Sequence, residues 1–259
     1  MAKTIQILAA ATCVIAAGCF DNRERPADVP TARSTAELRA APNRAALVRV
    51  YLRGAKDFKA DDLRDLPAAE VLDLSELGLA TPPEAVYALP KLSQFYFVRN
   101  TMEKLPDALV ALKLTYLNLD GNRIAALPDG IGTMTTLKWL RLNNNQLAEL
   151  PQSCSGLKDL RRVYLRGNKF KAVPEALKGL PALEDIALDG NQIETVPDWL
   201  VSMASLRHLS LANCPIRKLP DDLSGFKRLR ILSLAGCPLP PEEVKRVRAA
   251  VGDAVAVTF

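Results

Sequence analysis

The strongest constraint on this chain is a pattern of leucine and asparagine that returns every 22 or 23 residues. The consensus is LxxLxLxxNxLxxLPxxLxxLxx, and from Leu114 onward each step is 23 residues. A fixed period of this length is typical of a solenoid, in which each repeat packs only against its neighbours. The successive copies begin at Leu47, Ala69, Leu92, Leu114, Leu137, Leu160, Leu183, Leu206 and Leu229.

Each position of the repeat has a physical reason. The central LxL alternates between inward and outward side chains, which predicts a short strand with its leucines in the core. The asparagine that follows turns the chain, and its amide can bond backbone groups that would otherwise be buried without partners. In the run Asn143–Asn145, only Asn145 holds this position, so we expect the other two to point outward. The predicted ladder consists of Asn100, Asn122, Asn145, Asn168 and Asn191, followed by Cys214 and Cys237.

The prolines predict the return path of each repeat. Those at 106, 128, 151, 174, 197 and 220 follow Leu or Val, and five of these six precede an acidic residue. Proline starts a helical turn readily, and an acid suits the positive end of a helix. We therefore expect a short helix or 3-10 turn on the convex side of every repeat.

This pattern resembles the leucine-rich repeat family, and the resemblance covers about residues 46 to 259. It implies an α/β solenoid: a curved parallel sheet of about ten short strands on the concave face, with short helices or 3-10 turns on the convex face. In that family cysteine replaces the ladder asparagine as a small buried residue. We accordingly interpret Cys214 and Cys237 as structural, together with Cys154 in the core, and expect no disulfide.

The ends of a solenoid must cover their apolar faces. Residues 34–45 predict a capping helix before the repeats of 46–240, and residues 241–259 predict a C-terminal cap. In that cap an amphipathic helix precedes a last strand, because Val255 and Val257 lie 23 residues after Leu232 and Leu234.

The first residues have the layout of a secretory leader. One lysine precedes an apolar run, which predicts a signal peptide over 1–18. Its end, Ala16-Ala17-Gly18-Cys19, resembles the lipobox of bacterial lipoproteins, in which Cys19 would be lipidated and residues 19–33 would form a flexible tether. The family prefers a larger aliphatic residue at position 16. The alternative is an ordinary secreted protein cut at the same bond. The location we expect is the bacterial envelope, with inner and outer membrane left open.

Aromatic and basic side chains gather on the predicted concave face. Tyr, Trp and Arg dominate protein-binding surfaces, so we expect a protein partner there. Three alternatives stay open: the aromatics and arginines fill the sheet surface, Arg141, Arg162 and Arg166 bind anionic glycan or lipid headgroups, or the solenoid is a spacer without a ligand. The candidate binding residues are Tyr96, Tyr116, Trp139, Arg141, Arg162, Tyr164, Arg166 and Asp189.

Other functions are disfavoured by composition. The chain has one histidine, His208, and five cysteines without a CxxC pair, so we expect neither a metal nor another cofactor. A net charge of +5 without basic and aromatic interleaving does not indicate nucleic acid. His208 lies near Ser210 with no fixed third partner, and we expect no enzyme activity.

Overall fold

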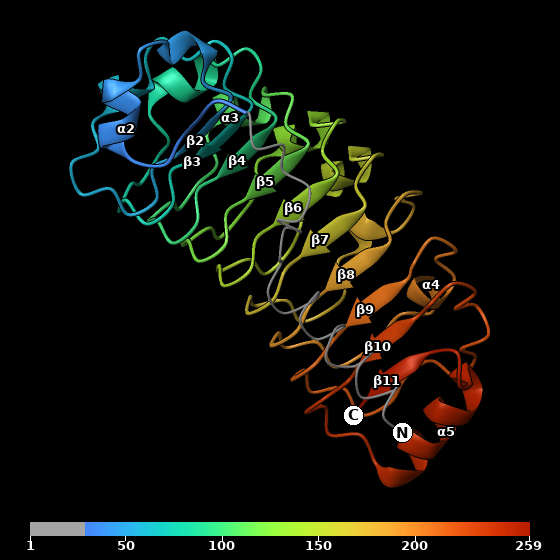
Figure 1. The fold of residues 1–259 in the computed structure, drawn as a ribbon. Coiled ribbons are helices and arrows are strands. Elements are labelled where there is room, and N and C mark those ends of the chain that lie inside the picture. The colour runs from blue at the N-terminus through green and yellow to red at the C-terminus, as the bar shows by residue number, and fades with distance from the viewer. Residues whose placement is uncertain (1–28) are drawn as a thin grey trace.

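The computed structural model describes residues 29–259, which form one sheet of eleven parallel strands hydrogen-bonded in chain order (Figure 1). The strands are β1 (Thr31–Ala32), β2 (Arg49–Tyr51), β3 (Val71–Asp73), β4 (Gln94–Tyr96), β5 (Tyr116–Asn118), β6 (Trp139–Arg141), β7 (Arg162–Tyr164), β8 (Asp185–Ala187), β9 (His208–Ser210), β10 (Ile231–Ser233) and β11 (Ala256–Thr258).

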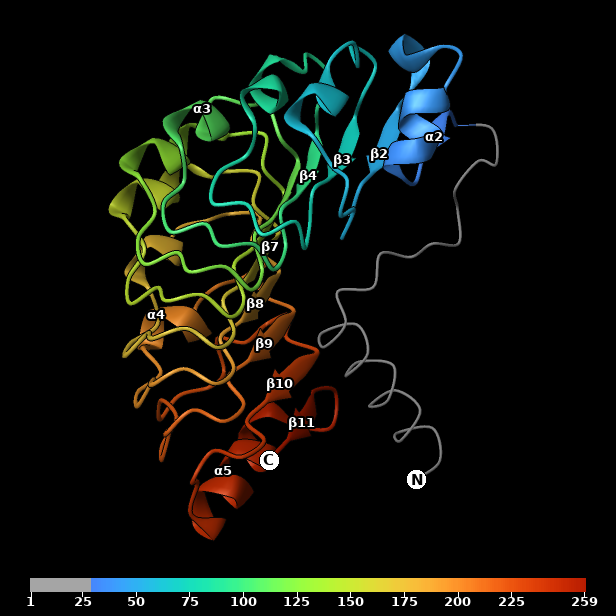
Figure 2. The same ribbon diagram turned by 90° about the vertical axis from the view of Figure 1, so that its left-hand side faces the viewer.

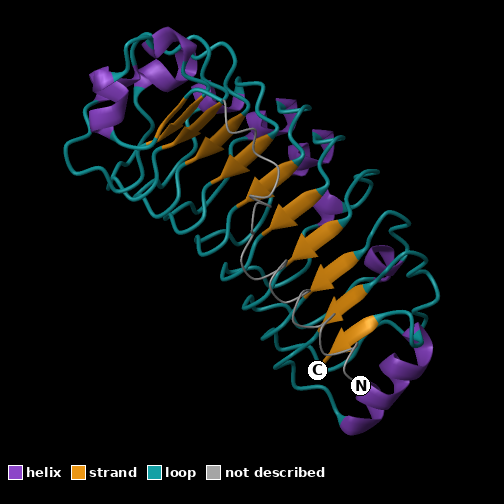
Figure 3. Cartoon of the chain, viewed as in Figure 1, coloured by secondary structure: helices purple, strands orange, loops and turns teal. Residues whose placement is uncertain are grey.

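Short helical segments return the chain along the opposite side. They are α2 (Thr35–Ala40), η2 (Arg44–Ala46), η3 (Ala60–Leu63), η4 (Glu84–Ala88), α3 (Asp107–Val110), η5 (Asp129–Thr133), η6 (Gln152–Gly156), η7 (Glu175–Leu177), α4 (Asp198–Val201) and α5 (Pro241–Val251). In Figure 2 the strands line the inner side of an arc and the segments between them lie outside it. Figure 3 shows the same separation by colour. The predicted curved solenoid is confirmed.

The register of the sheet explains the core. Residues at the same position of neighbouring repeats lie opposite each other in adjacent strands, as Leu117 and Leu140 do. The middle residue of each strand from β2 to β10 is therefore stacked inward and almost fully buried. This column is Val50, Leu72, Phe95, Leu117, Leu140, Val163, Ile186, Leu209 and Leu232.

The predicted asparagine ladder is confirmed. Asn145 Oδ1 accepts the Ile124 N–H of the preceding repeat at 3.0 Å, and its Nδ2 donates to the carbonyls of Leu119 at 3.0 Å and Leu142 at 3.1 Å. One side chain thus satisfies backbone groups of two repeats. The thiols that replace asparagine keep half of this role, since Cys214 Sγ donates to the Leu188 carbonyl.

The expectation that Asn143 points outward is wrong. Asn143 is 6% exposed, and its Oδ1 accepts the Arg166 N–H at 2.8 Å. The Asp120 carboxylate accepts the Asn143 N–H in the same way, also at 2.8 Å. A second ladder therefore runs beside the first. Asn144 is exposed as expected, with a φ of 53° in the left-handed region that asparagine tolerates.

Two other expectations need correction. The repeat that begins at Leu206 has no helix or 3-10 turn after Pro220, because Asp222 instead closes a local turn by accepting the Ser224 N–H. The predicted tether also ends earlier than residue 33, since Thr31 and Ala32 pair with β2. Cys19 and the proposed leader lie outside the described residues.

Both ends of the sheet carry a helix. At the start, the Ser34 hydroxyl caps α2 by accepting the Glu37 N–H at 3.1 Å. At the other end, Glu243 of α5 accepts the Leu219 N–H at 2.8 Å, which ties this helix to the last full repeat. Within residues 29–259, no helix has the length and apolar character needed to cross a membrane.

Candidate binding surface on the concave sheet

The candidate residues come from strands β4 to β8 and the residues that follow them. Because each strand is in the same register, equal repeat positions form columns across the sheet. One column contains Tyr116, Trp139 and Arg162, and the next contains Arg141 beside Tyr164. We call the concave side chains over β4 to β8 the concave patch: Tyr96, Tyr116, Asp120, Trp139, Arg141, Arg162, Tyr164, Arg166, Asp185 and Asp189.

A continuous stack of rings crosses the patch. The Tyr96 and Tyr116 ring centroids are 4.8 Å apart, and those of Tyr116 and Trp139 are 5.7 Å apart, with both pairs tilted. The Arg162 guanidinium carbon lies 4.2 Å from the Trp139 ring centroid and extends the stack. Contacts of this kind hold the side chains in one position, because Tyr116 and Trp139 each contact a stacked neighbour on both sides.

The arginines of the patch are neutralised by aspartates of neighbouring repeats. The charged atoms of Arg141 and Asp120 are 2.7 Å apart, and so are those of Arg166 and Asp189. In a third pair, Arg162 Nε lies 2.9 Å from the carboxylate of Asp185. The Arg141 and Asp120 side chains are only 12% and 13% exposed, so this pair is largely desolvated.

Tyr116 and Tyr164, two of the candidate binding residues, are buried below the surface of the patch. Their exposures are 4% and 5%, because neighbouring patch side chains cover them. Burial raises the pKa of Tyr116 to about 12 and also raises the pKa of Tyr164. Their rings lie under the exposed part of the patch, where Tyr116 contacts Trp139 and Tyr164 contacts Arg141. Trp139 and Arg162 are half-buried and reach its surface.

The arginine pairs also bear on the anion-binding alternative. Arg141, Arg162 and Arg166 each have a carboxylate partner already, so the three do not form an unneutralised cluster. An anionic ligand would have to displace those carboxylates. The sequence contains a signal for the pairing, since acids and arginines recur about one repeat apart, but this signal is visible only when the outward residues of neighbouring repeats are compared.

His208 and Ser210 do not form a nucleophile pair. His208 Nδ1 lies 2.7 Å from Asp185 Oδ1, whereas the Ser210 hydroxyl donates to Asp189. The two side chains thus have separate acidic partners, and the histidine shares its carboxylate with Arg162. Nowhere in residues 29–259 do three His, Cys, Asp or Glu side chains converge as metal ligands would.

Family models match the repeats. Residues 107–212 match the model described as Leucine-rich repeat region, and residues 205–226 match the one described as Leucine Rich Repeat. Residues 107–226 thus match leucine-rich repeat models, and the fold is that of a leucine-rich repeat solenoid. This fold is typical of protein–protein interaction modules, and neither model indicates an enzyme family.

Three solved structures share the fold. A leucine-rich repeat protein of Leptospira interrogans is 22% identical over 83% of this chain and 73% of its own, with a TM-score of 0.54. An internalin of Listeria monocytogenes is 19% identical over 86% and 69%, with a TM-score of 0.65. The ectodomain of the Arabidopsis thaliana receptor kinase GASSHO1/SCHENGEN3, solved in complex with Casparian Strip Integrity Factor 2, is 26% identical with a TM-score of 0.63. The match covers 80% of this chain but 26% of that ectodomain.

Proposed function

We propose that the chain is a non-enzymatic protein-binding module whose partner docks on the concave patch. The observation that carries this proposal is the ring stack that ends in Arg162 over Trp139, because it presents a rigid amphipathic surface. Side chains that are already fixed lose little conformational entropy when a partner binds. The plant ectodomain, solved with its factor, supports a binding role for a related solenoid.

The partner surface that fits the patch is mixed in character. Tyr96 and Trp139 offer half-buried ring faces, while Arg162 and Arg166 have side chains that are 31% and 19% exposed and already neutralised. Such a surface favours aromatic contacts and hydrogen bonds over attraction between opposite net charges. A spacer without a ligand would need none of these side chains.

Paired substitutions test the binding proposal. Tyr96→Ala with Trp139→Ala removes the two half-buried rings of the patch, whereas Tyr87→Ala with Trp199→Ala removes a half-buried tyrosine and tryptophan from η4 and α4 on the convex side. Partners crosslinked from a native envelope fraction should disappear with the concave variant and persist with the convex control. Equal capture by both folded variants would contradict a concave binding surface.

We further propose that the module is held on a bacterial envelope membrane by lipid at Cys19. The support is the sequence before residue 20, where an apolar leader ends in Ala-Gly-Cys. Several acyl chains would hold the protein firmly, since each buried CH2 contributes about 0.8 kcal/mol. The intact mass of the protein purified from its native membrane tests this. A mature chain that begins at an unmodified Cys19 would establish ordinary secretion instead.

A further inference from the structure

A second surface feature lies at the C-terminal end of the solenoid. A cavity of about 1090 Å³ opens where the chain enters β9, β10 and β11. Among the residues that line it are five cationic side chains and one carboxylate, a formal charge of +4 with His208 neutral, against +5 for the whole chain. We call these side chains the basic rim: Arg207, Lys227, Arg228, Arg230, Arg248 and the acid Asp253.

The position before each strand explains why charge accumulates here. Arg161, Glu184, Arg207 and Arg230 directly precede β7, β8, β9 and β10. The Glu184 carboxylate lies 3.9 Å from Arg161 and 3.8 Å from Arg207, so it serves both neighbours. The next equivalent residue after Arg230 is Val255, which is apolar. The alternation of charge is therefore broken at Arg230, which follows Arg207 where an acid would continue the series, and the equivalent position before the next strand holds no acid either.

Four cations of the basic rim have no ionic partner. Within residues 29–259, Lys227, Arg228, Arg230 and Arg248 make no ion pair, and all four side chains are exposed. Arg248 lies over the Phe259 ring, with its guanidinium carbon 5.2 Å from the centroid. The arginines of the concave patch are neutralised, whereas these cations are not.

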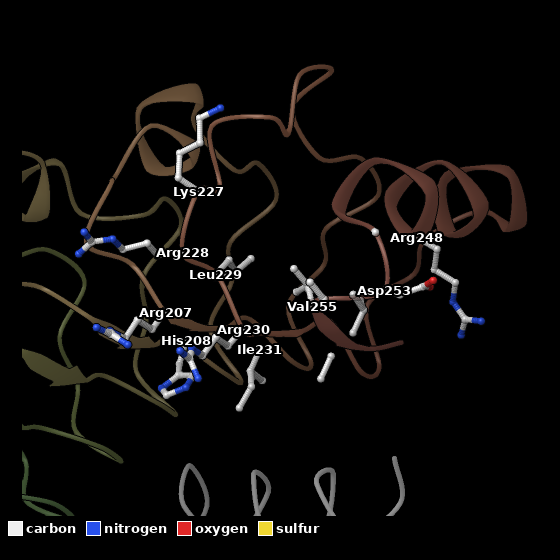
Figure 4. Close-up of a pocket in the computed structure, with 14 residues that line it drawn as sticks. Arg207, His208, Lys227, Arg228, Leu229, Arg230, Ile231, Arg248, Asp253 and Val255 are labelled. Carbon is white, nitrogen blue, oxygen red and sulfur yellow. The ribbon is translucent and has the colours of Figure 1, made fainter. Parts of the chain in front are cut away.

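The cations surround an apolar floor. Figure 4 shows Lys227 and Arg228 on one side of the cavity and Arg248 on the other, with Leu229 and Val255 between them. Leu229 and Val255 are buried, at 5% and 9% exposure, so the floor is formed by core side chains that cannot rearrange freely. Charges held around one cavity repel each other, and a ligand that carries several negative groups relieves this repulsion.

We propose that this cavity binds a ligand with several linked phosphate groups. Four unpaired cations around one cavity require several negative charges close together, and linked phosphates have a high charge density. Guanidinium groups also bind phosphate oxygens through two parallel hydrogen bonds. The cavity volume of about 1090 Å³ is slightly above the range of about 300–1,000 Å³ that is typical of small-molecule sites, so the cavity has room for such a ligand. Either a soluble polyphosphate or the headgroups of an acidic phospholipid surface would supply this chemistry.

Calorimetric titration of the purified protein with tripolyphosphate tests the site. The variant Arg228→Ala with Arg230→Ala should bind about tenfold more weakly or worse, since the loss of even one charged hydrogen bond to phosphate weakens binding by about that factor. The matched control is Arg123→Ala with Arg217→Ala, which removes two exposed arginines that follow β5 and β9 and do not line the cavity. It should stay within about twofold of wild type, because salt screens distant charges. Both variants are checked for an unchanged melting temperature.

Asp253→Asn supplies a gain-of-binding test that does not depend on removing cations. Asp253 is exposed and is the acid that lines the cavity, so its neutralisation should tighten tripolyphosphate binding. Weaker binding by this variant would contradict the proposal. Because the concave patch is unchanged in all three variants, partner capture by that surface should not respond, and the two proposals can fail separately.

The choice of probe distinguishes the sources of phosphate. Vesicles of phosphatidylglycerol in phosphatidylcholine, compared with phosphatidylcholine alone, present phosphate on a membrane, and tripolyphosphate presents it in solution. Binding to either one that depends on Arg228 and Arg230 supports the site and identifies its source. The proposal is overturned if neither binds, if the control variant loses as much affinity, or if polyglutamate binds equally well, because the site would then recognise acidic peptide.

Discussion

Arg162 connects the two systems of the concave patch. Its guanidinium lies 4.2 Å from the Trp139 ring centroid, and its Nε is 2.9 Å from an Asp185 carboxylate oxygen. Asp185 in turn contacts His208. A ring stack and an ion-pair network thus meet at one side chain, which explains how a surface so rich in charge and aromatics keeps a single arrangement.

This arrangement predicts a measurable coupling between Trp139 and Arg162. A double-mutant cycle of Trp139→Ala and Arg162→Ala should give an interaction energy of about 0.5–1 kcal/mol, as expected for a cation–π contact at a partly exposed site. Urea denaturation followed by circular dichroism measures it. The control is Trp199→Ala on the convex side combined with Arg162→Ala. The destabilising effects of these two substitutions should be additive. Additivity in the concave pair would show that the contact contributes nothing to stability.

The Arg141–Asp120 pair should matter far more than surface ion pairs. Asp120→Ala leaves the Arg141 charge desolvated and the Asn143 N–H without its acceptor. Loss of one partner from a buried pair costs about 3–5 kcal/mol. Asp221→Ala breaks the Lys218–Asp221 pair, whose side chains are 65% and 83% exposed, and should change stability little. Similar midpoints for the two variants in denaturant would contradict the burial argument.

The period of the sequence was sufficient to predict the solenoid because every repeat meets the same surroundings. An inward leucine such as Leu140 stacks on its equivalent in the next repeat, and Asn145 bonds backbone that is one repeat away. Nothing beyond the spacing is needed for either inference. The same reasoning placed the candidate residues on one face, since alternate strand residues share a side.

Contacts between side chains in neighbouring repeats were harder to predict. Which aspartate meets Arg141, and how far Tyr164 is covered, depend on rotamers and on crowding across the curved sheet. The Asp120–Arg141 pair is diagonal, because its residues are 21 apart in the sequence. Arg162 and Asp185 lie directly opposite each other instead, and Arg166 and Asp189 are also 23 residues apart. The missing convex turn after Pro220 has a similar origin, because a local bond from Ser224 to Asp222 competes with helix formation.

The two neighbouring asparagines of the run give a prediction for the ladder. Asn145→Ala leaves the Ile124 N–H buried without a partner, at about 1–3 kcal/mol, and removes one of the two side-chain donors to the Leu119 carbonyl, which keeps Asn122 Nδ2 at 2.9 Å. Asn144→Gly should stay within about 1 kcal/mol of wild type, because the residue is exposed and its φ of 53° suits glycine. Chemical denaturation of both variants separates these outcomes. Equal losses of stability in the two variants would contradict the assignment of Asn145, and not Asn144, to the ladder.

Acidification should loosen the C-terminal cap through Glu243. The Arg246 guanidinium, which hydrogen-bonds to this carboxylate, lowers the Glu243 pKa below its ordinary value of 4.5. An acid whose pKa is lower in the folded state than in the unfolded state stabilises the fold fully above its ordinary pKa. That contribution is lost as the pH falls through the folded value.

The melting temperature should therefore fall between pH 5 and pH 3, and Glu243→Ala should remove part of that dependence while destabilising the protein at neutral pH. Glu242→Ala is the matched control, since its exposed side chain makes no ion pair in the described part of the chain. Because Glu243 also accepts the Leu219 N–H at 2.8 Å, amide exchange at Leu219 should rise at low pH in the wild type. The exchange rate is corrected for the intrinsic pH dependence of amide exchange. An unchanged corrected rate at Leu219 between pH 7 and pH 3 would contradict the prediction that the Glu243 carboxylate holds the cap in place.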